Sequence, residues 1–324
     1  MKPPSMPAPG LDDLDAAIAE ARAFNSGIER LLGSQPSVHT LPPAIVRRAR
    51  REGRGVFAPP ALLPEARDVT IAARSGELRL RVLAPTTRAA TGVYLHIHGG
   101  GWMLGAADLQ DKELLALANA TGLVAASVEY RLAPEHPYPA GPDDCEDAAR
   151  WLVAGGAATL GAPPRLFIGG ESAGAHLSVV TLLRLRDRHG ITGAFQAANL
   201  LYGGYDLSMT PSQRRWGDRN LVLSGPILNF FGDAFVPHLD REGRRDPDVS
   251  PLFADLAGMP PALFTVGTLD PLLDDTLFME ARWRAAGCDS VLRVWPESIH
   301  GFDAFPTKMA DAARASIAEY LARA

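Results

Sequence analysis

The sequence of 324 residues lacks the features of disulfide-bonded or membrane-spanning proteins. Its two cysteines, Cys145 and Cys288, are too few for a disulfide framework, so both are expected to be free thiols in a reducing compartment. No stretch approaches the roughly eighteen consecutive apolar residues of a membrane span, and the N-terminus has no apolar signal-peptide core. We therefore expect a cytoplasmic protein without integral membrane association.

The sequence also lacks an excess of positive charge. Its formal net charge is −5, whereas nucleic-acid phosphates attract clustered Lys and Arg side chains. The one dense basic stretch, Arg47-Arg48-Ala49-Arg50-Arg51, is short, and we interpret it as a solvated helix face. A nucleic-acid partner is therefore not expected.

The N-terminal part is predicted to be helical and to precede the sheet. Residues 1–10 are rich in proline and are predicted to form a disordered tail. Apolar residues then recur at helical spacing, for example at Leu14, Ile18 and Phe24. We therefore assign residues 1–53 to an N-terminal helical segment and residues 54–324 to the main domain.

The remainder predicts an α/β fold with an eight-stranded, mostly parallel sheet flanked by helices. Two alternating runs flank Ser75-Gly76 and predict an antiparallel hairpin. The later runs are almost wholly apolar, as expected for strands buried on both faces of a sheet. The predicted strands are 68–71, 78–82, 93–97, 123–128, 166–168, 197–201, 263–266 and 291–295, and the predicted helices between or after them are 109–120, 142–153, 173–188, 276–286 and 304–322.

One segment interrupts this alternation of strands and helices. About sixty residues separate the strand ending near Tyr202 from the strand starting near Pro261, which is too long for a structureless loop. We predict that residues 204–250 form an inserted segment that joins residues 1–53 in a helical cap. The candidate residues of the substrate pocket are aromatic: Trp102, Trp216, Phe230 and Phe231.

A candidate nucleophile lies in Gly170-Glu171-Ser172-Ala173-Gly174, which has the pattern G-x-S-x-G. An apolar run precedes this pentapeptide and a helix-forming stretch follows it. Such a serine sits on a sharp turn between strand and helix, where small neighbours avoid clashes and the hydroxyl is exposed. Taken alone, the motif could also be an ordinary glycine-rich turn.

A second motif, His98-Gly99-Gly100-Gly101-Trp102, follows the predicted strand 93–97. Consecutive glycines leave backbone N–H groups free to bind a developing oxyanion, and each such donor is worth roughly 3–4 kcal/mol in the transition state. We select Gly100 and Gly101, together with the N–H of Ala173 after the nucleophile. The alternative for this motif is a flexible glycine turn.

A serine hydroxyl needs a base within hydrogen-bond reach. His300 alone among the eight histidines lies between the last strand and the last helix, and Asp270 follows the penultimate strand. The order Ser172, Asp270, His300 is that of an α/β-hydrolase triad. Asp274 and Asp275 are alternative acids, but they begin the following helix, where helix capping explains them.

Three further histidines are not assigned to the reaction. His96 and His98 lie together at a strand end, but no third ligand or cysteine cluster accompanies them, so no metal site is expected. His176 lies just inside the helix after the nucleophile and is interpreted either as a packing residue or as a residue that supports those of the site.

In these motifs the sequence resembles the hormone-sensitive-lipase-like branch of the α/β-hydrolases, the bacterial family IV esterases. The similar segments are His98–Trp102, Tyr130–Ala140, Gly170–Gly174, Asp270–Leu272 and His300–Phe302. The resemblance implies hydrolysis of carboxylic esters, typically with short acyl chains, without a cofactor and beneath a helical cap. It runs from about residue 67 to the C-terminus and is weaker over the cap segments.

Two residues depart from the family pattern, since Glu171 and Ala175 stand where Asp and Gly are usual. The expected reaction proceeds through an acyl-enzyme on Ser172 with a small-molecule ester as substrate. Hydrolysis of a lactone, amide, carbamate or sugar acetate by the same triad stays open. A non-catalytic ligand receptor is the other alternative, but such relatives usually lack the histidine, which is present here. An exposed last strand could pair two subunits in a homodimer.

Overall fold

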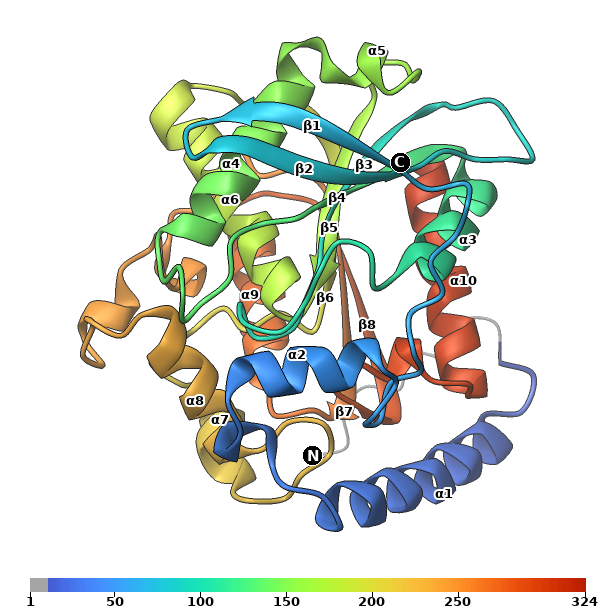
Figure 1. Cartoon of the computed structure of the whole chain (residues 1–324), viewed down its shortest axis with the longest axis vertical. Helices are drawn as coiled ribbons and strands as arrows, with labels where there is room; N and C mark the ends of the chain where they lie inside the picture. The colour runs from blue at the N-terminus through green and yellow to red at the C-terminus, as the bar shows by residue number, and fades with distance from the viewer. Residues whose placement is uncertain (1–10) are drawn as a thin grey trace.

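The computed structural model describes residues 11–324, which form one eight-stranded sheet with helices on both faces (Figure 1). The strand order is β1-β2-β4-β3-β5-β6-β7-β8, with β2 antiparallel to β1 and β4 and every later pair parallel. The predicted eight-stranded, mostly parallel sheet is confirmed. The strands are β1 (Arg67–Ala73), β2 (Gly76–Leu83), β3 (Gly92–Ile97), β4 (Leu123–Val128), β5 (Leu166–Glu171), β6 (Phe195–Leu201), β7 (Ala262–Leu269) and β8 (Ser290–Ile299).

The burial of the strands explains why their sequences differ. Every residue of β3 and β4 is buried, because helices cover both faces of the central sheet. Strand β2 instead alternates buried and partly exposed positions from Leu78 to Val82. One face of the sheet packs on α4, α6 and α9, and the other packs on α3, α10 and α1. These helices are α1 (Leu14–Gly33), α3 (Asp111–Thr121), α4 (Ala140–Trp151), α6 (Ala173–His189), α9 (Leu273–Ala285) and α10 (Lys308–Arg323), and the short α5 (Ala157–Thr159) follows α4.

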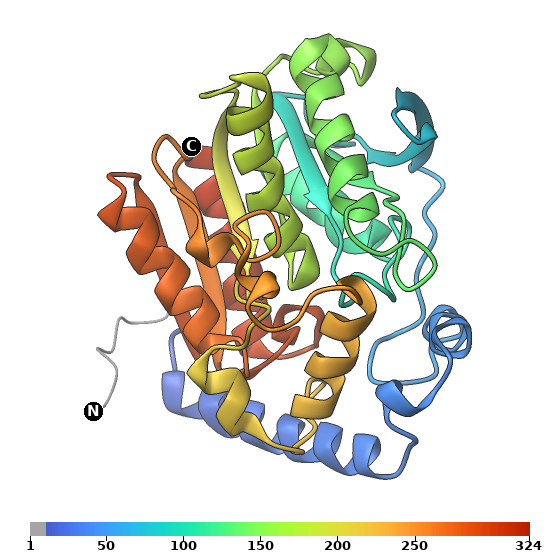
Figure 2. The same ribbon diagram turned by 90° about the vertical axis from the view of Figure 1, so that its left-hand side faces the viewer.

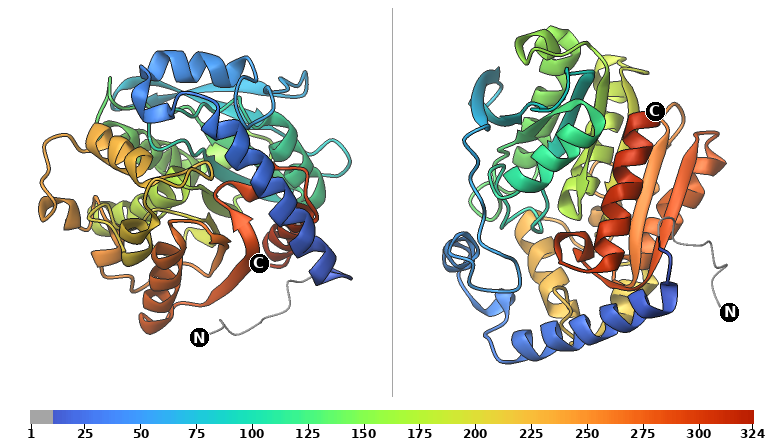
Figure 3. Two further views of the ribbon diagram at one scale, coloured as in Figure 1. Left: turned by 90° about the horizontal axis from the view of Figure 1, so that it is seen from below. Right: turned by 90° about the vertical axis from the view of Figure 1, so that its right-hand side faces the viewer.

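The two segments predicted as a cap lie at one end of the molecule. Helices α1 and α2 (Pro43–Arg51) come from the N-terminal segment, and α7 (Pro211–Trp216) and α8 (Gly225–Phe235) from the insertion. Figures 1 and 2 show all four at the same end, and the view from below in Figure 3 shows α1 crossing it. The prediction of a disordered tail concerns residues 1–10, which lie outside the described residues.

The basic stretch on α2 is only partly a solvated face: Arg48 and Arg51 are exposed, but the interpretation was wrong for Arg47. The Arg47 guanidinium donates hydrogen bonds to the carbonyls of Met103, at 2.7 Å, and Ala133, at 2.8 Å. It also forms an ion pair with Glu135 at 2.7 Å. Arg51 pairs with Asp108 at 3.1 Å. These contacts fasten α2 to the loops that follow β3 and β4.

None of the helices among residues 11–324 combines the length and the apolar character needed to cross a membrane.

Candidate active site

Ser172 lies on the turn between β5 and α6, as the motif predicts. Its φ of 55° and ψ of −117° place it in a region that residues with a side chain rarely adopt. A Cβ added at Gly170 or Gly174 would overlap the carbonyl oxygen of Ile97 at the end of β3. The two glycines are therefore required because the turn lies directly against the neighbouring strand, and this contact holds Ser172 at the carboxyl end of the sheet.

The three residues predicted as a triad form one hydrogen-bonded line. His300 Nε2 lies 2.9 Å from Ser172 Oγ, and His300 Nδ1 lies 2.9 Å from Asp270 Oδ2. Asp270 is 1% exposed and His300 is 5% exposed. The second Asp270 oxygen, Oδ1, accepts the N–H of Leu272 at 2.8 Å, which fixes the carboxylate. In this arrangement Nδ1–H donates to the aspartate and Nε2 can accept the serine proton.

Asp274 and Asp275 hold the inserted segment, and helix capping does not explain them. The N-cap residue of α9 is Leu272, which provides no side-chain cap. Asp274 accepts the N–H of Ser212 at 2.7 Å. Asp275 is buried, which raises its pKa to about 7 against the lowering effect of its donors. These donors are the N–H groups of Tyr205 and Asp206 and the side chains of Thr210 and Gln213.

Two of the predicted oxyanion residues, Gly101 and Ala173, line the same pocket as Ser172, and Gly100 precedes Gly101 in the glycine loop. Within residues 11–324, no group accepts a hydrogen bond from the backbone N–H of Gly100, Gly101 or Ala173. Gly100 has a φ of 114° and Gly101 a φ of 60°, and a Cβ on Gly101 would overlap the ring of Phe231 from α8. This glycine is therefore required both by its backbone conformation and by the close approach of α8.

Glu171, which departs from the family pattern, supports the glycine loop. Its Oε1 accepts the N–H of Gly99 at 2.7 Å, and its Oε2 lies 3.0 Å from His96 Nε2. His96 Nδ1 in turn lies 2.9 Å from Ser127 Oγ. Burial alone raises the pKa of Glu171, but attraction to His96 and the hydrogen bonds outweigh it and lower that pKa. Ala175, the other departure, is fully buried in the core.

The two histidines at the end of β3 do not belong to a metal cluster. Residues 11–324 contain no group of three or more His, Cys, Asp or Glu side chains that could hold an ion. His98 stacks on Tyr130 with ring centroids 4.2 Å apart, and its Nδ1–H donates to the carbonyl of Gly99 at 2.9 Å. Burial lowers the pKa of His98 to about 4, so its ring is neutral at neutral pH.

Trp102, at the end of the glycine loop, is held by the core and by the inserted segment. Its indole N–H donates to His176 Nδ1 at 3.1 Å, and its ring stacks on Phe235 of α8 with centroids 4.7 Å apart. His176 Nε2 lies 2.8 Å from the carbonyl of Val249, so Nε2 carries the proton. Burial lowers the pKa of His176 to about 4. Of the two interpretations of His176, the structure therefore favours the supporting role, because His176 orients Trp102.

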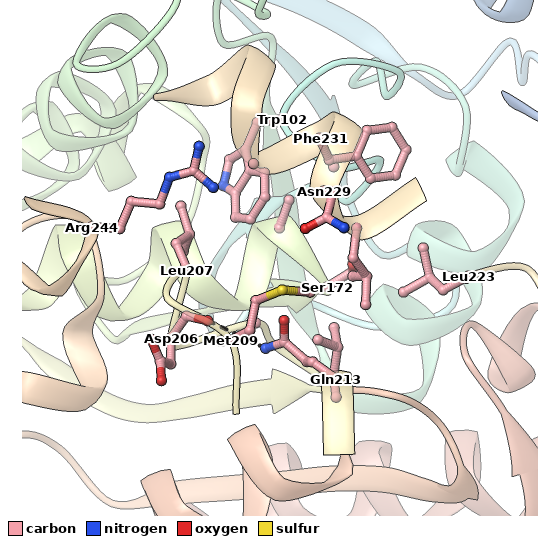
Figure 4. Close-up of a pocket in the computed structure, with 16 residues that line it drawn as sticks. Trp102, Ser172, Asp206, Leu207, Met209, Gln213, Leu223, Asn229, Phe231 and Arg244 are labelled. Atoms are coloured by element: carbon pink, nitrogen blue, oxygen red, sulfur yellow. Dashed lines mark hydrogen bonds between the residues drawn. The ribbon is translucent and has the colours of Figure 1, made fainter. Parts of the chain in front are cut away.

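A pocket opens beside Ser172 between the core and the insertion (Figure 4). It encloses about 540 Å³ of space, including open solvent at its mouth. Two of the four predicted aromatic residues, Trp102 and Phe231, line it. The pocket-lining residues that sequence reasoning missed come mostly from the irregular backbone and helices of the insertion: Asp206, Leu207, Met209, Gln213, Leu223, Leu228, Asn229 and Arg244, with Leu272 after β7.

The other two predicted pocket residues, Trp216 and Phe230, do not line this cavity. The Trp216 indole N–H donates to the carbonyl of Arg219 at 2.8 Å, and its ring packs on the cluster that includes α1 and α10. Phe230, on α8, is partly buried and packs against an apolar cluster that includes Leu104 and Phe231. Adjacent helical residues point about 100° apart, and on α8 the side that lines the pocket includes Phe231 but not Phe230.

The sequence and the structure resemble those of known esterases. A family model described as α/β hydrolase fold matches residues 94–304. A carboxylesterase named NlhH from Mycobacterium tuberculosis is 35% identical over 277 residues, covering 84% of this chain and 86% of the relative. A hyperthermophilic esterase from the archaeon Pyrobaculum calidifontis has a TM-score of 0.83 and 28% identity, covering 93% of this chain and 97% of the other.

A solved hormone-sensitive lipase from a metagenome library is also similar, with a TM-score of 0.79 and 25% identity, and it covers 94% of this chain and 97% of the other. The family model spans more than half of the chain, and the similarity to NlhH extends over most of both proteins. The chain therefore belongs to the α/β-hydrolase family, in its hormone-sensitive-lipase-like branch.

Proposed function

We propose that this protein hydrolyses carboxylic esters through an acyl-enzyme on Ser172. The observation that carries this proposal is the hydrogen-bonded line from Ser172 through His300 to Asp270, with distances of 2.9 Å at both steps. The esterase names of its relatives support the same activity. The presence and position of His300 argue against a receptor that has lost catalysis.

The reaction has two halves. His300 Nε2 takes the proton of Ser172 as the oxygen attacks the ester carbonyl, and Asp270 orients the imidazole and stabilises its cationic form. The oxygen of the tetrahedral intermediate accepts hydrogen bonds from the N–H groups of Gly100, Gly101 and Ala173. The alcohol leaves with the proton from His300, and water then releases the acid by the same route. These steps need no cofactor and no metal.

The pocket between Trp102 and Phe231 receives one part of the ester. Its walls are largely apolar, with Leu207, Leu223 and Leu272 around the space. A pocket of this size suits a short to medium acyl chain. Residues 11–53 and 204–250 form the cap over the catalytic domain in this proposal, because α8 contacts the glycine loop and α2 is fastened to the neighbouring loops.

The cellular setting is also part of the proposal. Both Cys145 and Cys288 are buried free thiols, which supports a reducing compartment such as the cytoplasm. Strand β8 lies at the edge of the sheet and pairs only with β7 among the described strands. Such an edge can pair with a second copy, which supports a homodimer.

Replacement of the nucleophile tests the function. Ser172→Ala is expected to abolish hydrolysis of p-nitrophenyl butyrate while the thermal melting curve stays unchanged, because the alanine removes only Oγ. A fluorophosphonate should label the wild-type protein and not the variant. Turnover by the variant above a few per cent of the wild-type rate, with normal folding, would overturn the assignment of Ser172.

A further inference from the structure

Arg50 differs from the other arginines of α2 because it is partly buried and yet has no ion-pair partner among residues 11–324. Arg47 and Arg51 are both ion-paired, and Arg48 is exposed to solvent. Arg50 is only partly exposed, and its guanidinium carbon lies 4.7 Å from the centroid of the Phe57 ring. No residue from 11 to 324 accepts a hydrogen bond from this guanidinium or forms an ion pair with it.

Contacts through Phe57 place Arg50 above the loop that carries His300. A Cβ added to Gly301, the residue after His300, would lie 3.6 Å from the Phe57 ring. Phe57 also stacks on Phe305, with ring centroids 5.4 Å apart and planes 11° from parallel. The Phe57 ring is therefore fixed against the loop that carries His300, and the Arg50 guanidinium lies over this ring.

The charged groups that affect Arg50 also belong to the surroundings of the predicted active site. Burial lowers the pKa of the Arg50 guanidinium, and the negative charge of Glu171, the residue before Ser172, acts in the opposite direction. The charge of Arg50 in turn contributes to lowering the pKa of His98 at the start of the glycine loop. The contacts of Phe57 thus place the cation beside the His300 loop, and the charge effects show that it acts on Glu171 before Ser172 and on His98 before the glycine loop.

No group around Arg50 neutralises it by contact. The carboxylate of Glu171 is already engaged by the Gly99 N–H and by His96. The ring of His98 is neutral, and burial raises the pKa of Tyr202 well above 10, so that phenol is uncharged too. A partly desolvated cation without an anion in contact is costly, and a bound anion would remove that cost.

We propose that Arg50 binds a carboxylate on the ester substrate, so that the enzyme prefers esters that carry a negative charge. A guanidinium matches a carboxylate with two parallel hydrogen bonds. Arg47 and Arg51 fasten α2 on both sides of Arg50, so little ordering is needed when the anion binds. Arg50 does not line the pocket between Trp102 and Phe231, so the charged end lies outside that pocket.

The inference rests on the proposed esterase function, and matched substrates separate the two. One pair carries the charge on the acyl side: mono-p-nitrophenyl glutarate against p-nitrophenyl valerate. The other carries it on the leaving group: 3-carboxy-4-nitrophenyl butyrate against p-nitrophenyl butyrate. For each pair, the ratio of kcat/KM between the anionic and the neutral ester is measured for wild type, Arg50→Gln, Arg50→Lys and Arg48→Gln. A ratio within one variant does not depend on the fraction of folded enzyme.

For at least one pair, Arg50→Gln is expected to lower the ratio of kcat/KM between the anionic and the neutral ester by about 10- to 100-fold, because the variant loses a charge-assisted hydrogen bond to the substrate. Arg50→Lys should keep part of the preference, and the exposed control Arg48→Gln should match wild type. An unchanged ratio in Arg50→Gln for both pairs would overturn the assignment of Arg50. If wild type turned over none of the four esters, the proposed esterase function would fail instead.

A measurement on the wild-type enzyme does not depend on the folding of any variant. Between 20 mM and 500 mM NaCl, kcat/KM for the preferred anionic ester should fall several-fold, because salt screens the guanidinium and chloride competes for it. The value for the neutral ester of the pair should change little. Equal salt dependence of the two esters would contradict a charge-specific site.

Discussion

His176 joins the glycine loop to the base of the insertion, and its replacement by leucine is predicted to destabilise the fold. The leucine fills a similar volume but removes the acceptor of the Trp102 indole N–H and the donor to the Val249 carbonyl. Val249 is 1% exposed, so its carbonyl cannot find water without a local rearrangement. Each buried group left unsatisfied costs about 1–3 kcal/mol, so we expect a loss of about 3 kcal/mol in the free energy of unfolding.

Two conservative variants separate the hydrogen bonds. Asparagine can place its amide oxygen near the position of Nδ1 and keep the contact with Trp102, whereas glutamine can reach the Val249 carbonyl. Urea denaturation should therefore rank His176→Asn and His176→Gln between wild type and His176→Leu. In a Trp102→Phe background the indole N–H is absent, so His176→Leu should cost about 1 kcal/mol less there. Equal costs in both backgrounds, or a cost below 0.5 kcal/mol (about the scatter of surface substitutions), would refute this reasoning.

The pH dependence provides an independent check on the same residue. Burial lowers the pKa of His176 from 6.5 to about 4, so the folded protein binds fewer protons at this site than the unfolded chain between these values. The stability that neutral His176 contributes is therefore full above pH 6.5 and is lost as the pH falls toward 4. Because leucine does not titrate, the difference between wild type and His176→Leu should shrink from pH 7.5 to pH 4.5. A constant difference over that range would contradict a neutral buried histidine.

Three further changes test the site. Asp270→Asn should lower kcat by a factor on the order of 10⁴, because the amide favours the wrong imidazole tautomer, and a greater loss in Asp274→Asn would show that the wrong acid was chosen. Gly101→Ala should reduce kcat at least about 10-fold at an unchanged circular dichroism spectrum, since the methyl group meets Phe231 and displaces one predicted oxyanion donor. EDTA should leave ester hydrolysis unchanged, and loss of activity that zinc restores would refute a metal-free reaction.

The sheet and the triad could be predicted because their signals are local in the sequence. Buried parallel strands read as short apolar runs, and the loops after β5, β7 and β8 follow such runs directly. Ser172, Asp270 and His300 each follow the carboxyl end of a strand, and these ends lie at one edge of the sheet. Their proximity can therefore be predicted from the positions of the strands, without information on side-chain packing.

The pocket could not be predicted in the same way, because it depends on how separate segments pack. Phe230 and Phe231 are adjacent phenylalanines that the sequence alone cannot distinguish. Only the orientation of α8 decides that Phe231 contacts Gly101 and lines the pocket. Arg47 looked like a solvated cation because its partners lie far along the chain, at Met103, Ala133 and Glu135. Tertiary contacts of this range have no periodic or motif signal in one sequence.

In the proposed reaction, the glycine loop connects the predicted cap with the predicted oxyanion donors. Residues 99–103 form no regular helix or strand, but contacts from four elements distant in the sequence hold this segment in place. Because an oxyanion donor contributes fully only when it is fixed before the reaction, these supports act on the same geometry that lowers the barrier. A change in the cap should therefore alter kcat as well as substrate preference, which a cap that only covers the pocket would not do. The four supports are Glu171 on the Gly99 N–H, Phe231 against Gly101, His176 on the Trp102 indole and Arg47 on the Met103 carbonyl.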